Sequence, residues 1–243
     1  MESQPSFTLN DLSAFPHDRQ EVARVHANRR VSKPRSRVLL RHTVVTAPSK
    51  SLPLILSELR TATTRQHLVL EKRIPFFTAD LLLYTRLIEA YYGFYRPLEN
   101  LLFPVATNIP GLDWLMRSKT PSLEADLYAL GLDAAAIDAI PLCPFSLQPR
   151  SIADVLGVLY VLEGATLGGQ SLRNGLYSRL GIDEHTGGRF FSVYGPSTLL
   201  MWRGFLACLY EVCDPVERAK SVVAAQATFE AFEGWLERCE VLV

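Results

Sequence analysis

From Ser51 onward, apolar residues recur at spacings of three and four, which is the pattern of a helix with one buried face. The first such face consists of Leu56, Leu59, Thr63, His67, Leu70 and Ile74. Pro75 ends this helix, because a proline ring blocks the preceding turn. The alternating pattern of a half-buried strand does not persist anywhere in residues 51–243. The sequence therefore predicts an all-α domain of about seven or eight helices.

Capping residues and prolines place several boundaries of these helices. Thr78 is expected to cap a helix over residues 81–102, with a kink at Pro97. The six prolines of residues 104–150 predict shorter helices joined by turns.

Three later helices have recognisable starts. Ser151 and Asp154 have the spacing of a capping box, with Asp in place of Glu, and the helix is expected to stop near Gly181. Pro196 and Ser197 precede the next helix. The last helix is expected to begin with an Asp cap, a Pro at the first helical position and a Glu at the third: Asp214, Pro215 and Glu217.

The charges divide the chain into two unlike parts. Lys plus Arg and Asp plus Glu each number 25, so the formal net charge is zero, which argues against a nucleic-acid binder. Residues 1–50 carry a net charge of +5, which leaves −5 for residues 51–243. We expect a basic, disordered N-terminal extension over 1–50, followed by a single helical domain over 51–243. A docking arm for an acidic partner is the alternative for the extension, whereas its acidic residues disfavour a transit peptide.

The apolar runs and the cysteines indicate a cytoplasmic protein. The longest apolar run, Val155 to Leu162, is far shorter than the roughly 20 residues that span a bilayer, so no membrane partner is expected. No apolar run follows the N-terminus as in a secretory signal. The four cysteines lack Cys-x-x-Cys spacing and are expected to be reduced, buried side chains: Cys143, Cys208, Cys213 and Cys239.

Three glycines lie in the middle of the long helix that starts near Ser151. Gly164, Gly168 and Gly169 each cost about 1 kcal/mol of helix propensity relative to Ala. Gly164 and Gly168 are four residues apart and share a face, so the backbone can bend there and approach something flat or bulky. Close packing against another helix is the alternative explanation.

His67 is the one histidine on a strongly periodic apolar face. A core histidine bonded within the protein is one interpretation. The other is a ligand, because Glu71 lies one turn later and could orient the imidazole. Arg60 lies seven residues earlier on the same face, roughly 10.5 Å along the helix axis. A planar ligand with a central metal and carboxylates at one edge would suit His67 and Arg60 together, and haem is such a ligand.

Together these residues resemble the haem oxygenases. Residues 59–67 with Glu71 resemble the proximal helix of that family, in which the histidine is the axial iron ligand. Residues 162–170, Leu-Glu-Gly-Ala-Thr-Leu-Gly-Gly-Gln, resemble its glycine-rich distal helix, and residues 188–191 resemble a later Phe-Phe segment. The amino-acid sequence of this glycine-rich segment most resembles that of bacterial members, including those that accompany bacteriophytochromes.

The resemblance extends over about residues 52–240 and implies a haem oxygenase-like helical bundle. It implies His67 as the iron ligand of haem b, which is both cofactor and substrate. Haem-binding roles follow for Arg60, Glu71, Arg203 (after Trp202) and the aromatic wall Phe229. Catalytic roles on the distal side follow for Gly164, Gly168 and Gly169.

The implied reaction is oxidative ring opening of haem to biliverdin, with release of carbon monoxide and ferrous iron. It requires O₂ and an external electron donor such as ferredoxin or a reductase, and a bacteriophytochrome could receive the biliverdin. This chain departs from animal members at Ala165, where they carry a distal Asp. The polar residues that could organise water instead are Thr166, Gln170, Arg173 and Asn174, and the sequence does not choose among them.

Two other functions fit the same features less closely. A helical haem-binding or haem-transfer protein without turnover would share the haem-contacting residues. A di-iron helical bundle would need several inward carboxylates with Glu-x-x-His spacing, for which the chain offers only weak candidates.

Overall fold

Seven α-helices and three short 3₁₀ helices form the secondary structure of residues 53–243, which the computed structural model describes except for the side chains of residues 171 and 172. Strands are absent from that part of the chain, so the all-α prediction is confirmed. The extension expected over residues 1–50 lies outside the described residues and stays a prediction.

The α-helices are α1 (Leu54–Arg73), α2 (Leu81–Ala106), α3 (Thr120–Ala129), α4 (Ala134–Asp138), α5 (Ile152–Leu180), α6 (Thr198–Leu209) and α7 (Pro215–Arg238). The 3₁₀ helices are η2 (Trp114–Met116), η3 (Phe190–Ser192) and η4 (Gly195–Ser197).

The apolar face predicted for α1 is the face that packs inward. Leu56, Leu59, Thr63 and Leu70 are buried, and His67 on the same face is half-buried. The Thr63 hydroxyl donates a hydrogen bond to the carbonyl of Leu59, which satisfies a polar group inside this apolar stripe.

Helix α2 begins at Leu81 as predicted, but its capping residue and its end differ from the prediction. Asp80, not Thr78, caps the helix, because its carboxylate accepts the N–H of Leu83. Thr78 is instead used in the preceding turn, where its N–H donates to the carbonyl of Pro75. The helix also continues past residue 102 to Ala106 and includes Pro104, so the series of shorter helices begins later than expected.

The later boundaries confirm the capping predictions. Ser151 and Asp154 form a complete capping box at the start of α5, and Gly181 ends that helix in the left-handed conformation with φ 68°. Asp214 accepts the N–H groups of Val216 and Glu217 at the start of α7. α6 begins at Thr198, directly after the 3₁₀ turn that contains Pro196.

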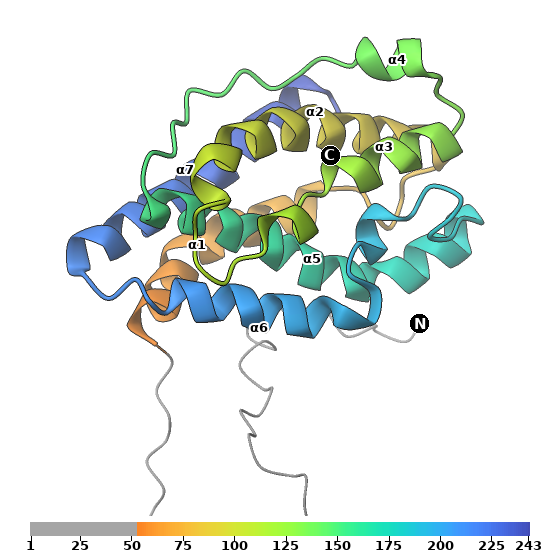
Figure 1. Cartoon of the computed structure of the whole chain (residues 1–243). Coiled ribbons are helices and arrows are strands. Elements are labelled where there is room, and N and C mark those ends of the chain that lie inside the picture. The colour runs from red at the N-terminus through yellow and green to blue at the C-terminus, as the bar shows by residue number, and fades with distance from the viewer. Residues whose placement is uncertain (1–52) are drawn as a thin grey trace, which may run out of the picture. The chain divides into compact units, whose positions relative to one another are not determined.

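Helix α5 runs across the centre of the bundle, with α2 and α3 above it and α6 below it in the view of Figure 1. It packs most extensively against α7, which in turn packs along α1. α1 and α7 run in the same direction, as shown by contacts that advance together along both helices: Glu58 with Arg218, Ala62 with Gln226, and Arg73 with Glu233.

The close approach of α5 and α7 depends on Gly157. A Cβ at this position would come within 2.1 Å of the carbonyl oxygen of Ser221, a distance that no side chain can adopt. The Ser221 hydroxyl also donates to the carbonyl of Ala153 across the same contact, at 2.7 Å.

One segment of α5, Ile152–Gln170, is long and apolar enough to cross a membrane, with a mean hydropathy of 1.4. Since 67% of that segment is buried inside the fold, core packing accounts for its apolar character.

Candidate functional site

His67 of α1 meets Phe229 of α7 at the contact between these two helices. The ring centroids lie 6.2 Å apart with an interplanar angle of 86°, an edge-to-face arrangement. About one third of the His67 side chain is exposed. The structure thus brings together two residues that are 162 positions apart in the sequence and that were both predicted to contact one ligand.

The imidazole of His67 is held in its neutral form near pH 7. Burial lowers the pKa of His67, and the nearby carboxylate of Glu71 opposes this effect only in part. The Nδ1 of His67 lies 3.8 Å from Oε2 of Glu71, too far for a hydrogen bond. Glu71 therefore acts on His67 through its charge, and the hydrogen bond expected to orient the ring is not made in this structure. A neutral imidazole has a lone pair that can bind a metal.

Two buried polar atoms near α1 have no hydrogen-bond partner among the described residues. They are Nε of Arg60 and the hydroxyl of Tyr160, a residue of α5. Burial raises the pKa of the Tyr160 hydroxyl, opposed by the nearby Thr63 hydroxyl and by the charge of Arg60. The Thr63 hydroxyl thus lies close to that of Tyr160, but it donates to the carbonyl of Leu59 and does not meet the Tyr160 hydroxyl at hydrogen-bonding geometry. Unpaired buried polar atoms are rare, and one explanation is a polar group of a bound ligand.

Tyr160 is a candidate that the sequence interpretation missed. It precedes Gly164 by four residues, so it lies on the same face of α5, just as Thr63 precedes His67 by four on α1. That spacing was the only available signal. It became informative once the structure placed the Tyr160 hydroxyl near Thr63 and Arg60 of α1.

The three mid-helix glycines have two different surroundings. A Cβ at Gly164 or at Gly168 would meet no described heavy atom within 4 Å. A Cβ at Gly169 would lie 3.1 Å from Cδ1 of Phe191. Close packing thus explains Gly169 and Gly157, whereas Gly164 and Gly168 border open space that a ligand can enter.

Trp202 and Arg203 are neighbours in the sequence but lie in different environments. Trp202 is buried on α6, with its ring 6.4 Å from that of Tyr160. Arg203 is exposed, and no hydrogen bond or ion pair joins it to another residue within 53–243. The structure therefore connects Trp202 to the Tyr160 side of α5 and leaves the Arg203 guanidinium available to an outside group.

Three of the four polar candidates for organising distal water are bonded within the protein. The Thr166 hydroxyl donates to the carbonyl of Leu162 within α5. Gln170 donates to the carbonyl of Gly195 and to the Thr198 hydroxyl, and Arg173 donates to the Ser192 hydroxyl. Asn174 is exposed.

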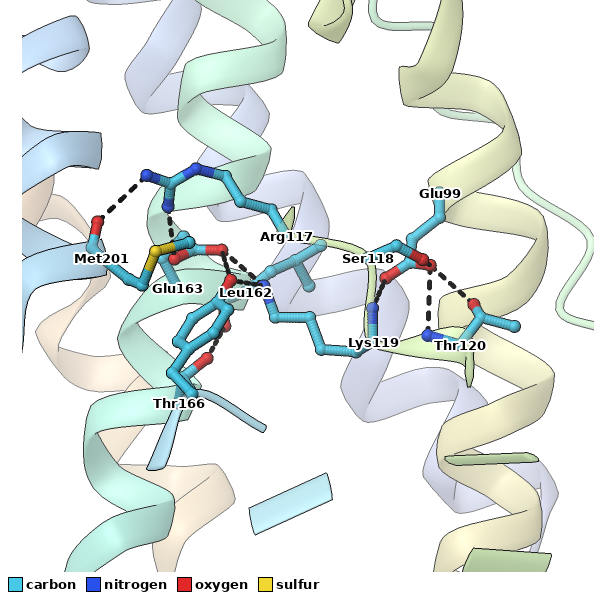
Figure 2. A network of polar contacts seen from close by, with 10 residues as sticks. Glu99, Arg117, Ser118, Lys119, Thr120, Leu162, Glu163, Thr166 and Met201 are labelled. Atoms are coloured by element: carbon cyan, nitrogen blue, oxygen red, sulfur yellow. Dashed lines mark hydrogen bonds and ion pairs between the residues drawn. The ribbon is translucent and has the colours of Figure 1, made fainter. Parts of the chain in front are cut away.

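Directly before Gly164, the carboxylate of Glu163 lies in a buried polar network (Figure 2). Its side chain is 1% exposed and pairs with Nη1 of Arg117 at 2.8 Å and with the ammonium of Lys119. The hydroxyl of Tyr194 donates to the same carboxylate at 2.8 Å. No sequence pattern indicated this network, because the partners of Glu163 come from turns 31 to 46 residues away that carry no periodicity.

The residues present fit haem. A haem iron takes one or two axial ligands from the protein, and neutral His67 can supply one. Gly164 and Gly168 leave room for a flat ring, and the unpaired Arg60 Nε and Tyr160 hydroxyl suit carboxylates at its edge. Within residues 53–243 no group of three or more His, Cys, Asp or Glu side chains is placed to hold a metal ion.

Comparison with known proteins gives consistent results. A family model described as Heme oxygenase matches residues 54–238. A heme oxygenase of Xanthomonas campestris pv. campestris (strain 8004) is 29% identical over 150 residues, which are 61% of this chain and 86% of that protein.

Two solved structures share the fold. The heme oxygenase of Neisseria meningitidis superposes with a TM-score of 0.61 at 19% identity, covering 78% of this chain and 93% of that one. The heme oxygenase of Leptospira interrogans superposes with a TM-score of 0.63 at 18% identity, covering 76% of this chain and 98% of that one.

Proposed function

The chain belongs to the haem oxygenase family, and on that premise we propose that it opens the ring of haem b to biliverdin, releasing carbon monoxide and ferrous iron. The reaction uses O₂ and electrons from an external donor such as ferredoxin or a reductase. The observation that carries this proposal is the half-buried imidazole of His67 on the inward face of α1, packed edge to face against Phe229 of α7.

In the proposed complex, His67 would hold the haem iron. Its Nδ1 faces Glu71, so Nε2 is the nitrogen that we assign to the iron. The negative charge of Glu71 raises the basicity of the ring, which strengthens an imidazole as a ligand. Phe229 restricts rotation of the ring from the α7 side.

The polar edge of the ligand is assigned to Arg60, Tyr160 and Arg203. Arg60 and Tyr160 gain the partners that their buried Nε and hydroxyl atoms lack, and Arg203 adds a second cation from α6. Charge-assisted hydrogen bonds from these groups would fix the rotational orientation of the ligand within the site.

Gly164 and Gly168 would leave room for the ring beside α5, because a Cβ at either position meets no described heavy atom within 4 Å. Haem supplies the iron that activates O₂ and the carbon skeleton that is oxidised. The chain supplies orientation, exclusion of bulk water by α5, and polar groups for protons. We keep Thr166, Gln170, Arg173 and Asn174 as the proton-relay candidates. Gly169 contributes by packing against Phe191.

The cytoplasm is the proposed location, and a bacteriophytochrome is a proposed receiver of the biliverdin. The direct test of the activity mixes the purified chain with haem, O₂ and a ferredoxin–reductase system. We expect the Soret band to disappear, biliverdin absorbance to rise, and chromatography to show one main biliverdin isomer.

A haem-binding or haem-transfer protein is the second candidate, supported by the same haem-contacting residues. It predicts a stable Soret band under reductant and O₂, followed by transfer of intact haem to an apo-globin. That result would contradict the proposed oxygenase activity.

A further inference from the structure

The buried network around Glu163 joins four segments of the chain. Arg117 and Lys119 lie between η2 and α3, Tyr194 lies just before η4, and Glu163 lies on α5. Nη2 of Arg117 also donates to the carbonyl of Met201 on α6, at 3.1 Å. Figure 2 shows the Arg117 side chain reaching both this carbonyl and the Glu163 carboxylate.

The charges in this network balance. A second carboxylate, Glu99 of α2, accepts hydrogen bonds from the backbone N–H of Lys119 and from the Ser118 and Thr120 hydroxyls. Two carboxylates and two cations thus share a region in which each of the four charged side chains is at most 6% exposed. Buried ion pairs add little to stability compared with well-packed apolar groups, because removing charges from water is costly. Their best-attested use is to fix one arrangement of packed elements.

The network is attached to a different side of α5 from the open glycine face. At about 100° per residue, Gly164 and Gly168 lie about 100° and 140° around the axis from Glu163. Gln170 follows Glu163 by seven residues and returns to nearly the same side. It bonds the carbonyl of Gly195 at 2.9 Å and the Thr198 hydroxyl.

Residues 194–198 are therefore fastened along α5 at two points that bracket the glycines. Tyr194 bonds Glu163 at one end, and Gly195 and Thr198 bond Gln170 at the other. The two points are two helical turns apart, so together they resist both rotation of α5 about its axis and sliding along it.

We propose that Glu163 is a positioning residue that, with the 194–198 fastening, sets the rotation of α5 and hence which edge of the haem ring faces Gly164 and Gly168. The inference rests on the proposed function and deepens it, because the position of the glycine face then decides which ring carbon is oxidised. Glu163 acts through α5 and has no contact with the ligand.

The test replaces Glu163 by Gln, which keeps the shape but removes the charge that pairs with Arg117 and Lys119. In the haem-free protein, we expect amide hydrogen exchange of residues 160–170 to quicken by about tenfold, as for loss of a charge-assisted hydrogen bond, with α7 amides unchanged. In turnover, we expect one biliverdin isomer to give way to a mixture. Glu217→Gln is the matched control, since its ion pair with Lys220 is exposed at the surface.

A second variant keeps the test decisive if Glu163→Gln fails to fold. The pair Tyr194→Phe and Thr198→Val removes one hydroxyl at each fastening point and leaves every charge paired. We again expect faster hydrogen exchange in residues 160–170 and a mixture of biliverdin isomers, each to a smaller extent than in Glu163→Gln. Equal loss of protection in α5 and α7 with an unchanged isomer would show that Glu163 contributes only to global stability, which overturns the inference. A wild-type protein without turnover would instead refute the proposed function, while the exchange result would still report on α5.

Discussion

At the scale of single residues, His67 shows how burial and charge compete for one proton. Burial lowers the pKa of His67 more than the Glu71 carboxylate raises it, so the imidazole is neutral at pH 7. A neutral ring on an otherwise apolar helix face is what a metal ligand requires, and the sequence pattern alone could not show its charge state.

Replacing His67 by Ala removes the proposed iron ligand. We expect the ferric Soret band of the haem complex to shift and to weaken, measured by absorbance spectroscopy against the wild-type complex. His185→Ala is the control, because His185 is exposed in a loop. An unchanged Soret spectrum in the His67 variant would rule out the assignment.

The buried hydroxyl of Tyr160 destabilises the haem-free fold, because it has no hydrogen-bond partner until a ligand binds. Its side chain is 3% exposed and its hydroxyl is unpaired. Tyr160→Phe should raise the unfolding free energy of the haem-free protein by about 1 kcal/mol, because an unsatisfied buried hydroxyl is removed.

The same variant should bind haem several-fold more weakly, because the ligand loses a hydrogen-bond donor. Chemical denaturation and haem titration measure the two effects separately. The assignment requires that the unfolding free energy rise while the haem affinity falls. A variant that is less stable and unchanged in haem affinity would contradict it.

At the scale of elements, α5 uses glycine for two purposes along one helix. Gly157 and Gly169 let α7 and Phe191 approach the backbone, whereas Gly164 and Gly168 border open space. Cap signals predicted where α5 begins and ends, because a cap is made within one turn of the chain. The neighbour of each glycine is set by other elements, so the sequence left both explanations open.

Gly168→Leu tests the open face against a matched position. Gly175 lies on the same helix, and a Cβ added there would also meet no described atom within 4 Å, so both substitutions gain about 1 kcal/mol of helix propensity. We expect Gly168→Leu to block haem binding or to shift the biliverdin isomer, and Gly175→Leu to leave both unchanged. Equal behaviour of the two variants in haem titration and product chromatography would refute the role of Gly168.

At the scale of the whole molecule, distant segments are held by a few buried polar groups. The carboxylate of Asp126 on α3 accepts the N–H groups of Arg189 and Phe190, and the Tyr84 hydroxyl of α2 donates to the carbonyl of Gly187. These bonds place η3 against Gly169 of α5. The family resemblance marked the Phe-Phe segment, but no local pattern marked Asp126 as its anchor.

Asp126 should make the stability of the protein depend on pH between about 4 and 6. Burial raises the pKa of Asp126 from 3.8 to about 6, so the folded protein binds this proton more tightly than the unfolded chain does. The unfolding free energy should therefore fall as pH rises through this window, by up to about 3 kcal/mol.

Chemical denaturation across this pH range compares the wild type with Asp126→Asn, which cannot titrate. The contribution that falls with rising pH should be absent from the variant and retained in Glu230→Gln, a substitution at an exposed α7 position. Parallel pH profiles for the wild type and Asp126→Asn would contradict the prediction.

The amino-acid sequence was sufficient to predict the all-α fold, the caps of α5 and α7, the histidine on α1 and the glycine segment on α5, because each of these is encoded within a few turns of chain. The packing of the helices was needed to show that His67 meets Phe229, that Gly169 packs against Phe191 while a Cβ at Gly164 or Gly168 would meet no described heavy atom within 4 Å, that Tyr160 has a buried hydroxyl without a partner, and that Glu163 pairs with Arg117. These features depend on contacts between residues 22 to 162 positions apart, whose geometry is set by how whole helices pack.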